Sequence, residues 1–240
     1  MKGDGKMKCI YFIPYATSDK TIYNPLINEV GKLSKGEIKL IPLELRGEGS
    51  RRREKLYDNI EDAIEDITNQ ITINNKEGYE VYLYGHCMGG VIAYGIYRKM
   101  KENNSINLKK IILGSVGVNI KSNLTFDQLM NNYIEEHING VVKSENEKLM
   151  QEVIEYYKAR LKQSFDILGE YYRHEKFIMD ENIIMINGKQ DPNCDVESMK
   201  QFIEGYDKVT KYMLEGEHLF LFKQIRNVST IIYNEVIKKK

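Results

Sequence analysis

In Tyr82-Leu-Tyr-Gly-His-Cys-Met-Gly-Gly-Val-Ile-Ala-Tyr94, an apolar strand pattern ends at Tyr84 and a helical pattern begins near Met88. The turn between them, Gly85-His-Cys-Met-Gly89, has the G-x-C-x-G spacing of a turn that presents a nucleophile. Glycines flank such a turn because its strained backbone leaves no room for neighbouring side chains. The turn would raise the sulfur of Cys87 above the carboxyl edge of a sheet, at a helix N-terminus that favours a thiolate. A small buried cysteine in a glycine-rich turn is the alternative interpretation.

Short β-branched and aromatic runs alternate with helix-like stretches on both sides of this turn. Several runs are almost continuously apolar, as in strands covered on both faces. The alternation predicts an α/β fold, with a mostly parallel central sheet, right-handed crossovers and flanking helices. The predicted strands are Lys8–Ile13, Ile38–Leu43, Glu80–Tyr84, Lys110–Leu113, Ile183–Ile186 and Lys211–Leu214. The predicted core helices are Tyr23–Leu33, Tyr57–Ile73, Met88–Lys101, Val196–Glu204 and Leu219–Val236.

One region, at about residues 120–180, interrupts this alternation. Its pattern predicts helices alone, chiefly Phe126–His137 and Glu145–Tyr172. The second helix carries apolar side chains at 3–4-residue spacing, including Leu149 and Tyr156, which predicts one buried face. A helical insertion between two strands is typical of a lid, and a long ordinary crossover is the alternative.

Composition excludes several classes of protein. The 240 residues carry a formal net charge of zero, so no overall field favours nucleic acid. No apolar run approaches the ~20 residues that span a bilayer, and the charged segment Met1–Lys8 lacks the apolar core of a signal peptide. Three cysteines without C-x-x-C spacing suit a reducing compartment rather than a disulfide framework or a zinc site. We therefore expect a cytoplasmic protein with no metal, nucleic-acid or membrane partner.

The organisation along the chain predicts a single domain over residues 1–240, with the helical lid at about 120–180. There is no internal repeat, low-complexity tract or Pro/Gly/Ser linker that would divide it. We expect a monomer, because no heptad seam or large apolar stripe outside the lid calls for a dimer.

A cysteine nucleophile needs a base, and the sequence offers four histidines. His218 follows the last predicted strand and opens the last helix, after the predicted acid in the chain order nucleophile, acid, histidine. His86 adjoins Cys87 in the turn, so we expect its side chain to point away and pack. His137 and His174 fall in the helical insertion. His218 is the predicted base, with a surface histidine as the alternative.

The acid should follow a late strand. Asp191 lies in the loop after the apolar run Ile183–Ile186. There it could accept the Nδ1–H of His218, which fixes the tautomer and stabilises the imidazolium. A turn-forming Asp-Pro is the plain alternative, and Asp195 is the competing carboxylate.

An oxyanion hole requires two backbone N–H groups directed at the developing charge. The N–H of Met88, directly after the nucleophile, should supply one. The loop after the first strand should supply the other, from Ala16 or Thr17, and the sequence leaves this choice open.

Four separated blocks, in order, give the chain a resemblance to the stand-alone (type II) thioesterases of nonribosomal peptide and polyketide assembly lines. Phe12-Ile-Pro-Tyr-Ala16 resembles the F-P-Y-A-G-G loop of that family, and Leu45-Arg-Gly-Glu-Gly-Ser-Arg51 resembles L-P-G-R-G-E-R. Gly85-His-Cys-Met-Gly-Gly90 matches G-H-S-M-G-G except at the nucleophile. Gly188-Lys-Gln-Asp-Pro192 and Gly216-Glu-His-Leu-Phe220 resemble the acid and histidine blocks, G-x-x-D-P and G-G-H-F-F.

The resemblance implies an α/β-hydrolase core with a helical lid. It also implies an acyl or peptidyl thioester substrate, carried on the phosphopantetheine arm of a carrier protein. It implies no metal or redox cofactor, and the usual role of the family is hydrolytic editing that supports antibiotic biosynthesis. The chain departs from the family at Cys87, which replaces serine, and at Thr17 and Ser18, which replace Gly-Gly. Arg46 and Glu48 stand where the family has Pro and Arg.

The cysteine leaves several functions open. Capture of a thioester by Cys87 is thioester exchange, so the acyl group stays activated and could pass to water or to an amine, hydroxyl or thiol. Hydrolysis is the main prediction and acyl transfer the alternative; transfer requires that water be excluded and an acceptor held close. A noncatalytic carrier-binding module and a general esterase are further alternatives. The lid tyrosines Tyr133, Tyr156 and Tyr157, and beyond them Tyr171 and Tyr172, could line the acyl pocket, or could be plain core.

Overall fold

The computed structural model describes residues 6–117, 147–174, 177–192, 194, 196, 199–200 and 203–237. In this part of the chain a parallel sheet forms the centre of the fold, with strand order β2-β1-β3-β4-β5-β6. All of its pairings are parallel. Its strands are β1 (Lys8–Ile13), β2 (Ile38–Pro42), β3 (Glu80–His86), β4 (Leu108–Gly114), β5 (Ile183–Gly188) and β6 (Thr210–Leu214).

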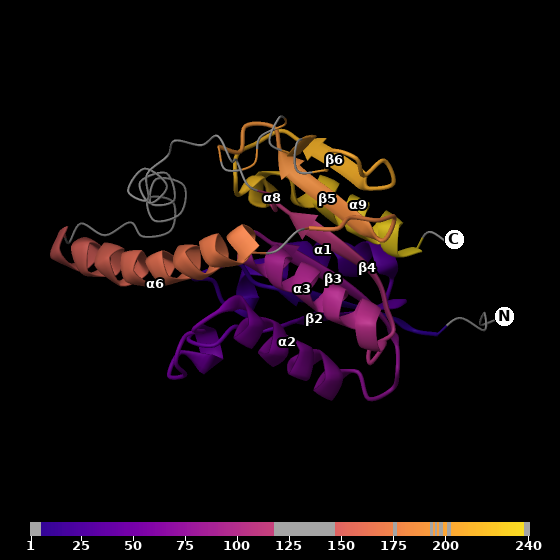
Figure 1. Cartoon of the computed structure of the whole chain (residues 1–240), viewed down its shortest axis with the longest axis horizontal. Helices are drawn as coiled ribbons and strands as arrows, with labels where there is room; N and C mark the ends of the chain where they lie inside the picture. The colour runs from indigo at the N-terminus through magenta and orange to yellow at the C-terminus, as the bar shows by residue number, and fades with distance from the viewer. Residues whose placement is uncertain are drawn as a thin grey trace.

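Helices cover both faces of the sheet (Figure 1). On one face, α1 (Asn24–Ser34) and α9 (Ile225–Ile237) pack side by side against Phe12 and Ile184. On the other face, α2 (Ile60–Asn74) and α3 (Met88–Asn103) bury their apolar residues. The central strands are therefore covered on both sides, which explains why they read as continuous apolar runs.

The order of the strands creates a switch point in the winding, at the carboxyl ends of β1 and β3. The chain passes from β1 to β2 on one side and then returns to form β3 on the other side of β1. In open parallel sheets, ligands bind outside the carboxyl ends of the strands at the point where the winding reverses. The loop after β1 and the turn after β3, which the sequence singles out, both lie at this point.

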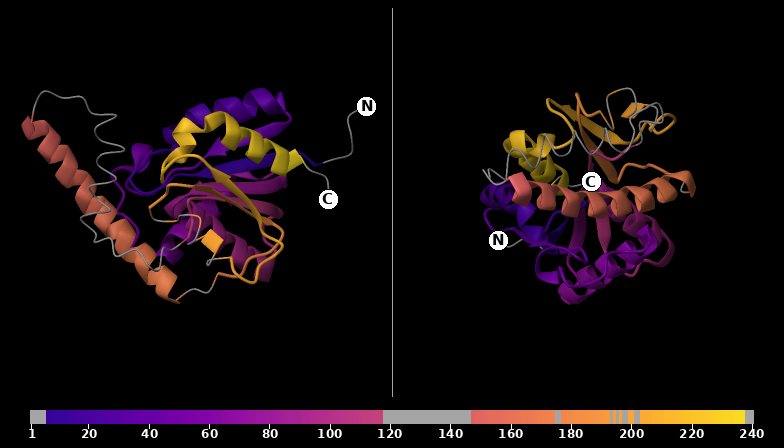
Figure 2. Two further views of the ribbon diagram at one scale, coloured as in Figure 1. Left: turned by 90° about the horizontal axis from the view of Figure 1, so that it is seen from above. Right: turned by 90° about the vertical axis from the view of Figure 1, so that its left-hand side faces the viewer.

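Helix α6 (Glu147–His174) runs past this end of the sheet and extends beyond it (Figure 1 and Figure 2). The predicted apolar face of this helix is buried only in its second half, where Leu161 is 2% exposed. In the first half, Leu149 is 48% exposed and Tyr156 is 53% exposed. The spacing therefore predicted the helix correctly but overstated the length of the buried face, because the first half projects past the core.

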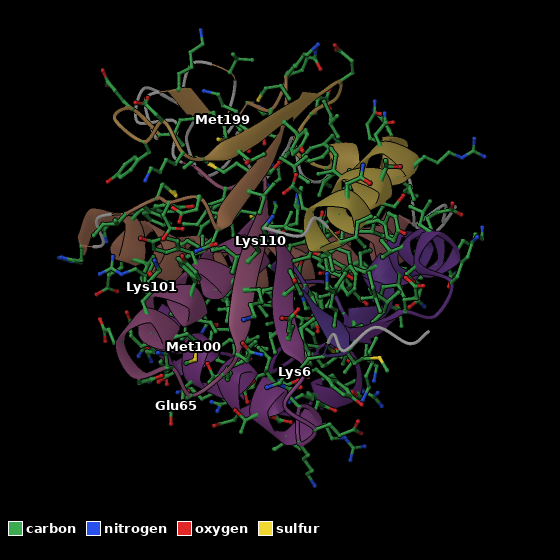
Figure 3. The ribbon with its side chains drawn as sticks, turned by 90° about the vertical axis from the view of Figure 1, so that its right-hand side faces the viewer. Lys6, Glu65, Met100, Lys101, Lys110 and Met199 are labelled. Carbon is green, nitrogen blue, oxygen red and sulfur yellow. The ribbon has the colours of Figure 1, made fainter. Side chains whose placement is uncertain are left out.

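A buried ion pair lies at the opposite end of the sheet, where the strands begin. Lys110, near the start of β4, lies between the sheet and α9 (Figure 3), and its Nζ is 3.0 Å from Oε2 of Glu235. The hydroxyl of Tyr212 donates to the same carboxylate at 2.8 Å. Lys8 donates to the carbonyl oxygen of Val236, so the start of β1 is joined to the end of α9.

All six predicted strands are present, with small shifts at their ends. The predicted helix Leu219–Val236 needs correction, because it is two helices, α8 (Phe220–Lys223) and α9, separated at Gln224. The side chain of Gln224 donates to the carbonyl of Glu215, which ties this break to the preceding loop. The predicted helix Phe126–His137 lies outside the described residues, and Val196–Glu204 lies only partly within them. Two short 3-10 helices, η1 (Lys20–Tyr23) and η2 (Gly49–Arg51), lie in the loops that follow β1 and β2.

Candidate active site

Cys87 occupies a strained turn between β3 and α3. Its backbone has φ 51° and ψ −120°, a region that L-residues rarely adopt. The N–H of Cys87 donates to the carbonyl of Gly114 at 2.8 Å, and its carbonyl accepts from the N–H groups of Gly90 and Val91. These bonds hold the turn in a conformation that would otherwise cost on the order of 1–3 kcal/mol. The strain fits the predicted role of presenting the sulfur.

The glycines of the motif follow from the tightness of this turn. A Cβ atom on Gly85 would lie 2.1 Å from the carbonyl oxygen of Gly89. A Cβ atom on Gly89 would lie 2.2 Å from the carbonyl oxygen of Ile13. The turn therefore packs backbone against backbone, both within itself and against the end of β1.

The structure brings His218 and Asp191 together with Cys87. Nδ1 of His218 lies 3.0 Å from Oδ2 and 3.2 Å from Oδ1 of Asp191. The carboxylate is fully buried, whereas the His218 side chain retains 16% exposure. The charge of Cys87 raises the pKa of His218, which places the thiol within electrostatic reach of the ring. The structure therefore pairs the predicted base with the predicted acid, and Cys87 lies near the same imidazole.

The electrostatics favour a protonated His218. Burial alone would lower the pKa of His218, but the charges of Asp191 and Cys87 and the hydrogen bond to Asp191 raise it. The net result is a pKa well above the ordinary value of 6.5.

His86 and Ser115 fix the backbone of the histidine loop, a role that sequence reasoning missed. Nε2 of His86 lies 2.7 Å from the carbonyl oxygen of His218, and Oγ of Ser115 donates to the same oxygen at 3.0 Å. Because a carbonyl oxygen can only accept, His86 carries a proton on Nε2. His86 is fully buried, as predicted for packing. The only signal for its second role was a polar residue inside an otherwise apolar turn.

The loop after β1 lies beside the turn that carries Cys87. Ala16, Thr17 and Met88 line one cavity of about 20 Å³, so the residues predicted to supply the oxyanion hole lie close together. Thr17 has φ 64°, and the N–H of Ser18 donates to the carbonyl of Tyr15. This turn needs a positive φ at Thr17, where glycine fits without strain. The conformation explains why the resembling family has glycine there.

The model of the thioesterase domain family matches residues 9–235. The chain belongs to the thioesterase domain family. Among solved structures, RedJ, a thioesterase from the prodiginine biosynthetic pathway in Streptomyces coelicolor, is similar with a TM-score of 0.72 at 17% identity, over 97% of this chain and 86% of that chain. BorB, a type II thioesterase from the borrelidin biosynthetic cluster, is similar with a TM-score of 0.70 at 17% identity, over 95% of this chain and 92% of that chain.

YbtT, a type II thioesterase from the yersiniabactin NRPS/PKS biosynthetic pathway, gives a TM-score of 0.73 at 14% identity, over 98% of this chain and 94% of that chain. No curated protein matches the sequence at a significant level. The family match and these likenesses of fold confirm the predicted α/β-hydrolase architecture.

In this thioesterase domain, a charged contact docks α6 on the core. Nη2 of Arg160 lies 2.6 Å from Oε1 of Glu48 and also donates to the carbonyl of Gly47. Burial raises the pKa of Glu48, against the lowering effect of Arg160. Gln163, one turn further along α6, donates to the carbonyl of Tyr57 at 2.9 Å. The departure at Glu48 thus has a structural account: it provides the partner for a cation on α6.

The predicted lid tyrosines are distributed unevenly. Tyr156 packs edge-on against Tyr157 and stacks with Arg160, and neither tyrosine lines the cavity beside Met88. Tyr133 lies outside the described residues. Tyr172 lies nearer the site: burial, and then the charges of Cys87 and Cys194, raise the pKa of its phenol.

A buried pair behind the acid was not predicted. Nδ2 of Asn187 donates to the sulfur of Cys194 at 2.9 Å, and the N–H of Cys194 donates to Oδ1 of Asp191 at 3.3 Å. These contacts orient the carboxylate that faces His218. The competing acid, Asp195, lies outside the described residues.

The described part of the thioesterase domain offers no metal centre or membrane span. No three His, Cys, Asp or Glu side chains in it are grouped so that they could bind a metal ion. None of its helices combines the length and apolar character of a transmembrane segment.

Proposed function

We propose that this thioesterase domain hydrolyses acyl or peptidyl thioesters on carrier proteins through an acyl-enzyme on Cys87. The observation that carries the proposal is the hydrogen bond from His218 to the buried Asp191, on an imidazole whose pKa also responds to the charge of Cys87. The family match supports thioester chemistry. The neighbouring structures BorB and YbtT are named as type II thioesterases, which supports the assembly-line class of substrate. On this proposal the substrate arrives on phosphopantetheine in the cytoplasm, and no other cofactor takes part.

In the first half of the reaction, His218 takes the proton of the Cys87 thiol, and the thiolate attacks the thioester carbonyl. The new carbon–sulfur bond gives a tetrahedral oxyanion, which the N–H of Met88 and an N–H of Ala16 or Thr17 stabilise. Collapse breaks the bond to pantetheine. The departing sulfur takes the proton from His218, and the acyl group remains on Cys87.

In the second half, His218 removes a proton from a water molecule, which attacks the acyl-cysteine. Collapse of the second oxyanion releases the carboxylic acid, and Cys87 regains its proton from His218. Asp191 accepts the Nδ1–H throughout, so it stabilises the imidazolium formed in each half. An amine, hydroxyl or thiol could take the place of water, which would make the reaction an acyl transfer.

Intact-protein mass spectrometry after mixing with an acetyl-pantetheine thioester tests the proposal. We expect an acetyl adduct on Cys87 that decays to free acetate at the same rate with or without an added amine. An adduct that resists water but leaves as an amide would identify an acyltransferase instead. Absence of any adduct would contradict covalent catalysis and favour the binding-module alternative.

Three variants make the result specific. Cys87→Ala should abolish the adduct. Cys9→Ala, which removes a fully buried thiol in β1, should leave the adduct unchanged. Cys87→Ser should restore the residue of the resembling family and retain hydrolysis. An oxygen ester with the same acyl group should react much more slowly than the thioester, unless the protein is a general esterase.

A further inference from the structure

Two cavities lie along α6, and Ile167 lines both of them. The first is the cavity of about 20 Å³ beside Met88 and the oxyanion loop. Its volume gives room for about one water molecule. An acyl group on Cys87 that points into it can therefore be accommodated only if the group is very short.

The second cavity is much larger. Its volume is about 160 Å³, close to that of cavities that hold a benzene-sized molecule. It lies between the start of α2 and the last turns of α6, where Ile60 and Tyr171 provide buried apolar walls. Polar side chains complete its lining, and they are Asn59, Glu61, Glu170 and His174. The exposed carboxylates of Glu61 and Glu170 disfavour an anionic chain end.

We propose that Ile167 determines acyl-chain length by separating the site of Cys87 from this larger cavity. Ile167 is 8% exposed and lies on the part of α6 that is docked on the core. Gln163 and Ser164, the turn before it, line the smaller cavity, whereas Glu170 and Tyr171, the turn after it, line the larger one. The side chain of Ile167 thus lies where a growing acyl chain would pass from one cavity to the other.

This inference rests on the proposed acyl-Cys87 intermediate and adds the substrate class, which is short, uncharged acyl groups. The wild-type protein should acylate faster from acetyl-pantetheine than from octanoyl-pantetheine. Ile167→Ala should join the two cavities, and each further methylene that becomes buried favours binding by about fourfold.

The test compares acylation rates of Cys87 with acetyl- to decanoyl-pantetheine thioesters, measured by mass spectrometry. In Ile167→Ala the ratio of octanoyl to acetyl rates should rise at least about tenfold. Ile167→Val removes one methyl group, and its profile should shift by about one methylene, which covers the case in which the alanine variant fails to fold. Leu168→Ala, a buried residue on the same helix that lines neither cavity, should keep the wild-type profile.

A binding measurement separates this inference from the proposed function. In the Cys87→Ala background, Ile167→Ala should bind a nonhydrolysable octanoyl-pantetheine amide at least about tenfold more tightly, whether or not Cys87 is catalytic. If the wild-type protein forms no acyl adduct but this gain in affinity appears, the proposed function fails and the role of Ile167 stands. Unchanged affinity for the amide, or an Ile167→Ala chain-length profile equal to that of Leu168→Ala, would overturn the role of Ile167.

Discussion

At the level of single residues, His218 is stabilised as an imidazolium by Asp191, so its titration contributes to stability. The pKa of His218 in the folded protein is raised above the ordinary 6.5. A raised pKa stabilises the fold fully below the unfolded pKa, and this contribution is lost as pH rises through the folded pKa. The stabilising contribution of His218 is therefore lost over a range of pH that begins near 6.5 and extends upward.

Asp191→Asn should lower the pKa of His218 and should reduce kcat/KM for an acyl-pantetheine thioester by about 10²–10⁴-fold, because the imidazolium loses its carboxylate. The variant should be less stable than the wild type below pH 6.5, and this gap should narrow as pH rises. NMR titration of the ring and urea unfolding across pH measure these effects. The matched control is Asp166→Asn, which changes an exposed acid on α6. It should leave the pKa of His218, kcat/KM and the pH dependence of stability unchanged. A stability gap that widens with pH would contradict the assignment.

The three candidate catalytic side chains could be selected because each follows a strand that the apolar pattern locates. Cys87, Asp191 and His218 come directly after predicted strands, and parallel strands end at a common edge. His86 and Ser115 could not be assigned in this way. Their partner is a backbone carbonyl on a distant loop, and no residue pattern encodes which carbonyl a buried donor will reach.

At the level of elements, the docking of α6 depends on the contact between Arg160 and Glu48. Both side chains are nearly buried, with 13% and 12% exposure. Removal of the cation would leave a carboxylate buried without its partner, which is more costly than the pair itself contributes.

Arg160→Met should reduce the free energy of unfolding by about 3 kcal/mol at pH 8. At pH 5 the loss should be smaller, because burial already raises the pKa of Glu48 and the unpaired carboxyl can bind a proton. Urea unfolding at both pH values measures the difference. Lys162→Met, which removes an exposed partner of Asp166 on the same helix, should have almost no effect. An equal loss at both pH values would argue against Glu48 as the source.

The sequence predicted α6 but not its docking. Periodicity reports which side chains share a face, and Leu149 and Tyr156, which are seven residues apart, do share one. It does not report where the core ends, and only the second half of the helix reaches the core. The short helix α8 was missed for a related reason, since the break at Gln224 depends on a hydrogen bond to Glu215 in another loop.

At the level of the whole molecule, a buried ion pair and the candidate active site lie at opposite ends of the parallel strands. Lys110 and Glu235 form a buried pair at the end away from Cys87, and Tyr212 contributes a third hydrogen-bonding group. A change there should alter the free energy of unfolding and leave the triad intact.

Glu235→Leu should lower the free energy of unfolding by about 3–5 kcal/mol, because Lys110 would be left buried without a counter-charge. The double variant Lys110→Met with Glu235→Leu should recover most of this loss, since an apolar pair of similar size avoids the desolvation of both charges. Urea unfolding gives the free energies, and kcat/KM should stay within about twofold in any variant that folds. A double variant less stable than the single variant would contradict this account.

The hydrogen bond between His86 and the carbonyl of His218 provides an internal spectroscopic probe. The Nε2 proton of His86 is carried by the residue before Cys87, but its chemical environment is set by the backbone carbonyl of His218. Any shift of the histidine loop relative to the turn changes the length of this one bond, and with it the resonance of this proton. An NMR experiment that follows a single imidazole proton can therefore report the alignment of Cys87 and His218 during turnover, with no label on either residue.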